Sequence, residues 1–354
     1  MYTQVHKDII VDLVIIFLIG ALSFTWFRGN FLIAGGDRLF PPDRWENFIR
    51  CFYVWDTKIL GSASPRILAG TIPFNGFLVV SEIAGLSLVS AEKLWFYLMF
   101  TSAGLSMYYL TTSVVGGRLR RLAGVTSALF YMLNPYVAIN VVPQLWMYII
   151  FLPLILGLYI KGLDKRREFK YIFLICVVWT LTCTSGYVNP KFAIFNWAPL
   201  FLYLVFHMLA NRNKNETIRS LHFTGILVAL WSALNAYWIL PVAFSLEETI
   251  AAPLEVYATI GRTRLVDYAL NSAPLLEAMR LLGLWGLHSS YKGFPYSYWA
   301  PAYDTPIFIA IGFLIPLLAF ASMLHKPRDK HVLFFGLITI TGLFLMSGAH
   351  SPFG

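Results

Sequence analysis

Residues 9–27 read IIVDLVIIFLIGALSFTWF, and this stretch decides the fold. A helix of about 19 apolar residues is long enough to cross the hydrocarbon core of a bilayer. The stretch lacks the small-residue cleavage site that follows the apolar region of a secretory signal peptide. We therefore expect a first transmembrane helix that is retained in the protein.

The composition of the whole chain is that of a membrane protein. Of 354 residues, 58% are hydrophobic and only 13% are charged, and the mean hydropathy is +0.66. Soluble domains carry about 25% charged residues. We therefore predict an all-α polytopic membrane protein.

Apolar stretches long enough to span, or nearly so, recur along the chain and predict about nine crossings. They fall near residues 9–27, 94–115, 122–139, 145–160, 170–186, 192–210, 221–243, 305–324 and 331–347. The apolar stretch 75–88 is shorter, so we expect an interfacial or re-entrant segment there. Residues 1–354 then form a single transmembrane domain.

The distribution of Lys and Arg predicts the orientation. The short loops around 118–121, 161–170, 212–219 and 326–330 carry many more Lys and Arg residues than acids, whereas the other loops are balanced. The positive-inside rule places the basic loops and the N-terminus in the cytoplasm. Two long loops, 28–93 and 245–304, then face outward from the cell membrane.

Several function classes are disfavoured. The net charge of +9 follows the loops as a topology signal, so we do not expect a nucleic-acid partner. The three cysteines suggest neither a disulfide framework nor a metal site. No Walker loop, HExxH, paired CxxC or GxSxG motif is present.

The first outer loop contains the best candidate for chemistry. Residues 35–74 read GGDRLFPPDRWENFIRCFYVWDTKILGSASPRILAGTIPF. Asp37 follows Gly35 and Gly36, which permit close approach of the backbone to a ligand. Asp37 lies so soon after the first span that a base there could reach a hydroxyl beside a lipid-linked head group. The alternative is a solvated aspartate that caps a turn.

Two other acids of this loop have a structural interpretation. Asp43 follows a Pro-Pro pair and precedes Glu46 by three residues, a pattern typical of a helix N-terminus. Apolar residues then recur at helical spacing from Trp45 to Trp55. We expect an interfacial amphipathic helix over this run.

Asp56 is the second candidate carboxylate. Together with Asp37 it could bind a divalent cation or divide base and positioning roles. The spacing of these two residues matches no known metal motif, so the sequence requires no cofactor.

Cations that could hold a lipid phosphate are also present, and Arg is the best suited of these. In the first outer loop they are Arg38, Arg44, Arg50, Lys58 and Arg66, and in the second they are Arg262, Arg264 and Arg280. Gln144 and Lys191 lie at predicted outer helix ends and could line a cavity that opens outward. Ordinary surface charge balance is the alternative for each cation.

The chain resembles membrane glycosyltransferases of the GT-C superfamily, and more narrowly the arabinofuranosyltransferase D family and its uncharacterised relatives. The similar segments are Asp37, YVWDTKILGSA (53–63), the Pro73–Phe74 step, LWFYLMFTSAGLSMYYL (94–110), RRLAGVTSALFYMLNPYV (120–137), RLLGLW (280–285) and SPFG (351–354). Much of this likeness is hydrophobic pattern.

The resemblance implies a function. Such enzymes move a sugar from a polyprenyl-phosphate donor to a glycan or glycolipid acceptor outside the membrane, and here a pentofuranose is one candidate sugar. Asp37 would be the catalytic base, and Asp56 would position substrate or shape the loop. Relatives carry further helices and outer carbohydrate-binding domains, so we expect the chain to continue beyond Gly354.

Two other functions fit the same pattern. A non-catalytic membrane scaffold or complex subunit would bind lipid or a partner through the outer face. A transporter or flippase for a lipid-linked sugar should show inverted repeats and charged or broken helices at mid-membrane. No such repeat is visible in the sequence.

Overall fold

The computed structural model describes residues 2–33, 40–53, 55–56, 62–63, 71–139, 143–164, 168–182, 190–244, 273–283, 287, 290–291, 293–295, 299–325, 329–348 and 350. The chain divides into two compact units, Met1–Ser245 and Leu246–Gly354. That residues 1–354 form a single transmembrane domain stays a prediction.

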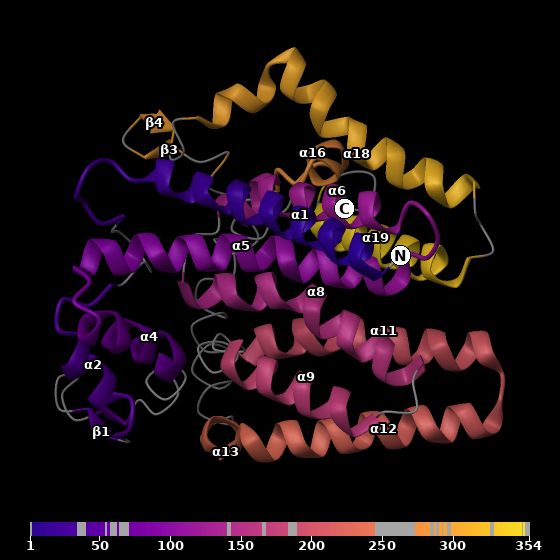
Figure 1. The fold of residues 1–354 in the computed structure, drawn as a ribbon, viewed down its shortest axis with the longest axis horizontal. Coiled ribbons are helices and arrows are strands. Elements are labelled where there is room, and N and C mark those ends of the chain that lie inside the picture. Colours follow the sequence, from indigo (N-terminus) through magenta and orange to yellow (C-terminus); the bar gives the residue numbers. More distant parts are fainter. Residues whose placement is uncertain are drawn as a thin grey trace. The chain divides into compact units, whose positions relative to one another are not determined.

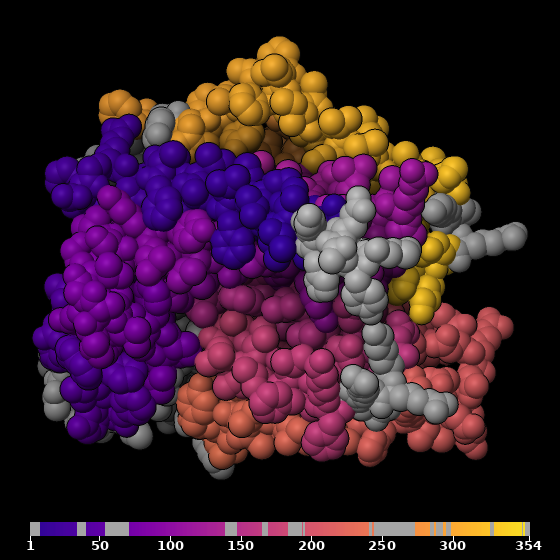
Figure 2. Space-filling view, in the orientation of Figure 1, coloured from indigo at the N-terminus to yellow at the C-terminus, as the bar shows by residue number. Residues whose placement is uncertain are grey.

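Three helices meet at the start of the first unit. They are α1 (Tyr2–Gly20), which continues as the 3-10 helix η1 (Ala21–Trp26), α5 (Leu88–Val114) and α6 (Arg120–Leu133). Gly104 of α5 makes this packing possible, since a Cβ there would lie 2.8 Å from Cγ2 of Ile16 and would also meet Met132 of α6. In the space-filling view the side chains of α1, in indigo, lie directly against those of α5, in purple (Figure 2).

A second group of helices completes the first unit. It consists of α8 (Pro143–Asp164), α9 (Glu168–Thr182), α11 (Pro190–Asn211), α12 (Lys214–Leu234) and α13 (Ala236–Phe244), and α8, α9, α11 and α12 lie side by side (Figure 1). Trp179 packs its ring 4.4 Å from that of Trp197 and 5.5 Å from that of Trp231. Burial of such large rings contributes much of the packing energy.

Two predicted spans are interrupted. In the predicted span 122–139, α6 ends before Asn134, whose ψ of 148° is extended. A second helix, α7 (Pro135–Ile139), follows. Oδ1 of Asn134 accepts a hydrogen bond from the Val137 N–H at 3.0 Å, so this side chain caps the new helix. In 221–243 the break lies at Asn235, between α12 and α13.

The described part of the first predicted outer loop contains two short helices and a small ladder. Helix α2 (Arg44–Arg50) packs against α4 (Ile72–Ile83), and β1 (Trp55–Asp56) pairs antiparallel with β2 (Ser62–Ala63). The predicted helix up to Trp55 is therefore wrong at its end, because the chain leaves the helix at Cys51 and Trp55 lies in β1. At about 18 Å, α4 is too short to cross a bilayer.

The second unit has its own helices. They are α16 (Leu275–Met279), the 3-10 helix η4 (Ala300–Asp304), α18 (Pro306–His325) and α19 (Lys330–Ser347), with a ladder of β3 (Ser290–Tyr291) and β4 (Phe294–Pro295). Helix α16 packs against both α18 and α19. Helix α18 has no fully buried residue, and many of its apolar side chains are exposed.

Among the described residues, five helices are long and apolar enough to cross a membrane. They are Asp8–Trp26, Met147–Asp164, Lys214–Leu234, Pro306–His325 and Lys330–Ser347. This supports a helical, membrane-embedded protein. The number of crossings, the orientation and the cell membrane as location stay predictions.

Candidate functional site

The predicted site residues fall into three groups. Asp37, Arg38, Arg66 and Arg262 lie outside the described residues. For Asp56, in β1, Gln144, at the start of α8, and Lys191, at the start of α11, the structure describes the backbone alone. Arg44 is described together with its side chain. The site is therefore built from the described residues that border residues 34–39, the Asp37 segment.

Glu92 holds the residue that precedes this segment. Its side chain is fully buried in the first turns of α5, and both carboxylate oxygens accept the Ile33 N–H, at 3.2 and 3.1 Å. The neighbouring Lys93 donates from Nζ to the Gly29 carbonyl at 2.9 Å. The chain between η1 and the Asp37 segment is thus attached to α5 at two points.

Phe40 is the residue that follows the segment, and aromatic rings hold it in place. Its ring lies 5.3 Å from that of Phe74 in α4 and 6.2 Å from that of Phe96 in α5. Phe96 is one helical turn beyond Glu92, so the two side chains share one face of α5. The two residues that border the six-residue segment 34–39 are therefore both held by this face.

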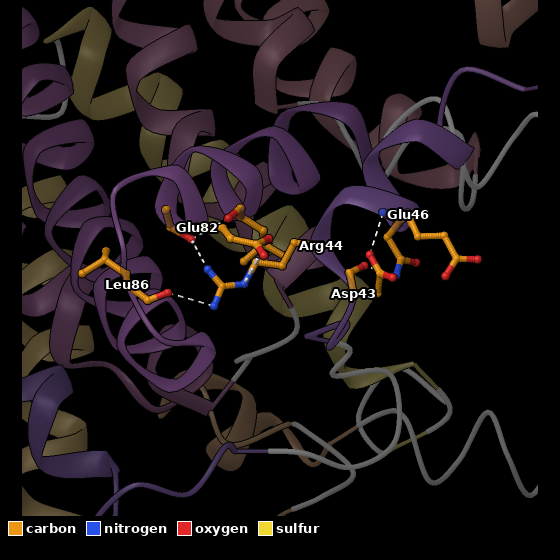
Figure 3. Close-up of polar contacts among 8 residues, drawn as sticks. Asp43, Arg44, Glu46, Glu82 and Leu86 are labelled. Carbon is orange, nitrogen blue, oxygen red and sulfur yellow. Dashed lines mark hydrogen bonds and ion pairs between the residues drawn. The ribbon is translucent and has the colours of Figure 1, made fainter.

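Arg44 is enclosed by protein groups, as Figure 3 shows. Its side chain is 7% exposed; Nη1 donates to Oγ of Ser81 at 3.1 Å, and Nη2 donates to the Leu86 carbonyl at 2.9 Å. Glu82 Oε2 lies 4.0 Å from Nε. These contacts favour a structural role, namely joining α2 to the end of α4. The predicted phosphate contact of Arg44 is untested, but its surroundings do not support it.

Asp43 caps α2, as the sequence predicts. Its Oδ1 accepts the Glu46 N–H at 2.8 Å (Figure 3). This satisfies one of the N–H groups that a helix start leaves without a partner in the helix. The structural interpretation of this acid is confirmed.

A buried polar network joins the two ends of the chain segment between α2 and α4. Nδ2 of Asn75 donates to Sγ of Cys51 at 3.1 Å and to Oγ1 of Thr71 at 2.9 Å, and Cys51 and Thr71 lie 3.3 Å apart. The network joins the end of α2 to the start of α4. The β1–β2 ladder, with Asp56, lies in the chain between these two anchored ends. Cys51 is a free, buried thiol, and it takes part in these hydrogen bonds.

Metal chemistry finds no support in the described residues, among which no group of three or more His, Cys, Asp or Glu side chains could hold an ion. The pair Asp37 and Asp56 lies outside that search. The described geometry shows that the residues on either side of segment 34–39 are held in place, Ile33 by the buried carboxylate of Glu92 and Phe40 by the rings of Phe74 and Phe96.

Sequence reasoning missed Glu92. A single carboxylate near the start of the apolar run 94–115 is an available signal, because acids in apolar helices are costly unless they have partners. Glu92 makes a further contact besides that with Ile33.

No family model matches the chain. No curated protein and no solved structure matches it either. The resemblance to GT-C glycosyltransferases therefore rests on the sequence segments alone.

Proposed function

We propose that the protein is a glycosyltransferase of the GT-C type, which moves a sugar from a polyprenyl-phosphate donor to a glycan or glycolipid acceptor. The observation that carries this proposal is the attachment of both borders of the Asp37 segment to one face of α5, through Glu92 and Phe96. Catalytic groups need a rigid scaffold that fixes their position. A loop attached in this way is suited to present a base.

In this proposal Asp37 is the general base. Its carboxylate accepts the proton of the acceptor hydroxyl while the bond between the sugar and the donor phosphate breaks. General base catalysis of this kind contributes about 10²–10⁴-fold to the rate. Asp56 follows Trp55 in β1, and we assign it a positioning role for substrate or loop.

The loop offers a matched pair of variants. Asp37→Asn removes the proposed base, whereas Asp43→Asn removes a carboxylate six residues away whose capping role Asn can fill. In vesicles that contain labelled polyprenyl-phosphate sugars and a glycan acceptor, we expect Asp37→Asn to reduce transfer by about a hundredfold or more. Asp43→Asn should retain wild-type transfer.

Near-normal turnover of the Asp37→Asn protein would reject the base assignment. A panel of donors that differ in the sugar, pentofuranoses included, identifies the substrate. If no donor supports transfer but a lipid-linked sugar crosses the bilayer in the same vesicles, the protein is a transporter instead.

A further inference from the structure

A cation in the second unit has an unusual position. Arg280 follows α16, its side chain is half-buried, and Nη2 donates to the carbonyl of Tyr303 in η4. The guanidinium carbon lies 5.9 Å from the ring centre of Phe313 in α18. Nε is buried and has no hydrogen-bond partner among the described residues. The charge is therefore held by a carbonyl and an aromatic face.

The backbone around Arg280 is adapted to this position. Leu281 has a φ of +59°, which is costly for a residue that carries a Cβ. Gly312 of α18 leaves room for the guanidinium, because a Cβ there would lie 2.9 Å from Nε and 3.2 Å from Cγ of Arg280. A strained residue and a glycine together bring the cation against α18.

The cation lies near the N-terminal end of α18. Phe313 is seven residues beyond the start of α18 at Pro306, about 10 Å along the helix axis. Trp299 and Tyr303 pack their rings 5.8 Å apart just before that start. Trp and Tyr are enriched at the level of the lipid head groups. The guanidinium of Arg280 thus lies between the carbonyl of Tyr303 and the ring of Phe313, within about 10 Å of the N-terminal end of a helix that is long and apolar enough to cross a membrane.

The charge has no counter-ion in the part of the chain that the structure describes. No carboxylate there forms an ion pair with Arg280, although the cation lies beside an apolar helix that buries none of its own residues. A cation in such surroundings is stabilised by an anion. The planar guanidinium matches the oxygens of a phosphate, which it binds through two parallel hydrogen bonds.

We propose that Arg280 forms a binding site for the phosphate group of a lipid, with α18 as the surface for the lipid chain. Two lipids present this chemistry: a bilayer phospholipid and a polyprenyl phosphate. The site consists of residues of the second unit alone. The proposal therefore does not depend on the sugar-transfer activity.

The test uses the full chain in a maltoside micelle that is free of phospholipid. Phosphatidylglycerol is compared with diacylglycerol, and a polyprenyl phosphate with the corresponding polyprenol, so that each pair differs in the phosphate. Binding is measured as the lipid concentration that half-saturates the bound population in native mass spectrometry. In at least one pair, we expect the lipid with the phosphate to bind and the lipid without it not to bind. The pair that shows this difference identifies whether the bound lipid is a phospholipid or a polyprenyl phosphate.

Three variants probe the site. Arg280→Gln should weaken binding about tenfold, the loss expected for a charge-assisted hydrogen bond. Arg280→Lys keeps the positive charge but loses the planar guanidinium that donates two parallel hydrogen bonds. Gly312→Ala keeps the guanidinium but displaces it. Both variants should therefore weaken binding less than Arg280→Gln does. Arg28→Gln, at an exposed arginine of the first unit, is the control and should bind as wild type does.

Circular dichroism of each lipid-free variant checks that it is folded. If Arg280→Gln loses helicity, Gly312→Ala and Arg280→Lys decide the outcome. Equal binding of phosphate-bearing and phosphate-free lipids, or wild-type affinity in every folded Arg280 and Gly312 variant, overturns the proposal.

Discussion

Arg121 binds Asp12 with two nitrogens: Nε donates to Oδ2 at 3.0 Å and Nη2 donates to Oδ1 at 2.9 Å. Tyr108 donates a third hydrogen bond to Oδ2 at 2.8 Å, and Nη1 of Arg121 lies 2.8 Å from Oδ2 of Asp8. The hydrogen bond to Asp12 raises the pKa of Arg121, so the guanidinium stays charged. The cluster joins α1, α5 and α6 at one end.

The two acids of this cluster should differ in their effect on stability. The side chain of Asp12 is 6% exposed, whereas that of Asp8 is 43% exposed. Exposed ion pairs contribute little, whereas a buried carboxylate that accepts hydrogen bonds from Arg121 and Tyr108 is costly to replace, although the side chain of Arg121 is itself 41% exposed. We expect Asp12→Asn to lower the unfolding temperature by about 3–5 °C, and Asp8→Asn to change it little. Thermal unfolding in detergent, followed by circular dichroism, measures both; equal shifts would contradict the assignment.

Arg44 provides a second test of a structural role. Its loss leaves the Leu86 carbonyl and Oγ of Ser81 without this donor, and a buried polar group without its partner costs about 1–3 kcal/mol. Arg44→Gln should therefore lower the free energy of unfolding by about that amount. Glu82→Gln is the matched control, since Glu82 is 45% exposed and 4.0 Å away. Substrate affinity that changes in Arg44→Gln without any loss of stability would restore the predicted phosphate contact.

The cap of α2 can be tested with two substitutions of one residue. Asp43→Ala removes the acceptor for the Glu46 N–H and should cost about 1 kcal/mol of unfolding free energy. Asp43→Asn keeps an acceptor oxygen and should cost close to nothing. Chemical denaturation in mixed micelles compares the two. If both variants lose the same stability, charge rather than capping is the contribution of Asp43.

What could be predicted from the sequence is local. A helix lies at each predicted apolar span, because apolar composition over many residues determines that class of element. The cap at Asp43 was predictable because its donor is only three residues away. The break at Asn134 had a signal, the Asn-Pro dipeptide, since the residue before proline avoids the helical region.

What could not be predicted depends on contacts between distant parts of the chain. Asp12 and Arg121 are 109 residues apart, and Ile33 and Glu92 are 59 apart. Arg44 has the same local sequence whether it faces a lipid phosphate or the end of α4. Only the packing of α2 on α4 separates the two roles, and the sequence of one chain does not contain that packing explicitly.

Glu92 allows the anchoring of the Asp37 segment to be tested without any assay of activity. Glu92→Ala removes the acceptor of the Ile33 N–H, so this amide should exchange its hydrogen about five- to tenfold faster, the factor expected for one hydrogen bond. Glu92→Gln keeps an acceptor oxygen and should protect the amide better. Hydrogen exchange resolved to residues 29–33 measures the effect, and amides of α12 serve as internal reference. Unchanged exchange at Ile33 in both variants would show that Phe40 and its aromatic neighbours suffice to hold the segment, and the role of Glu92 would have to lie in its other contact.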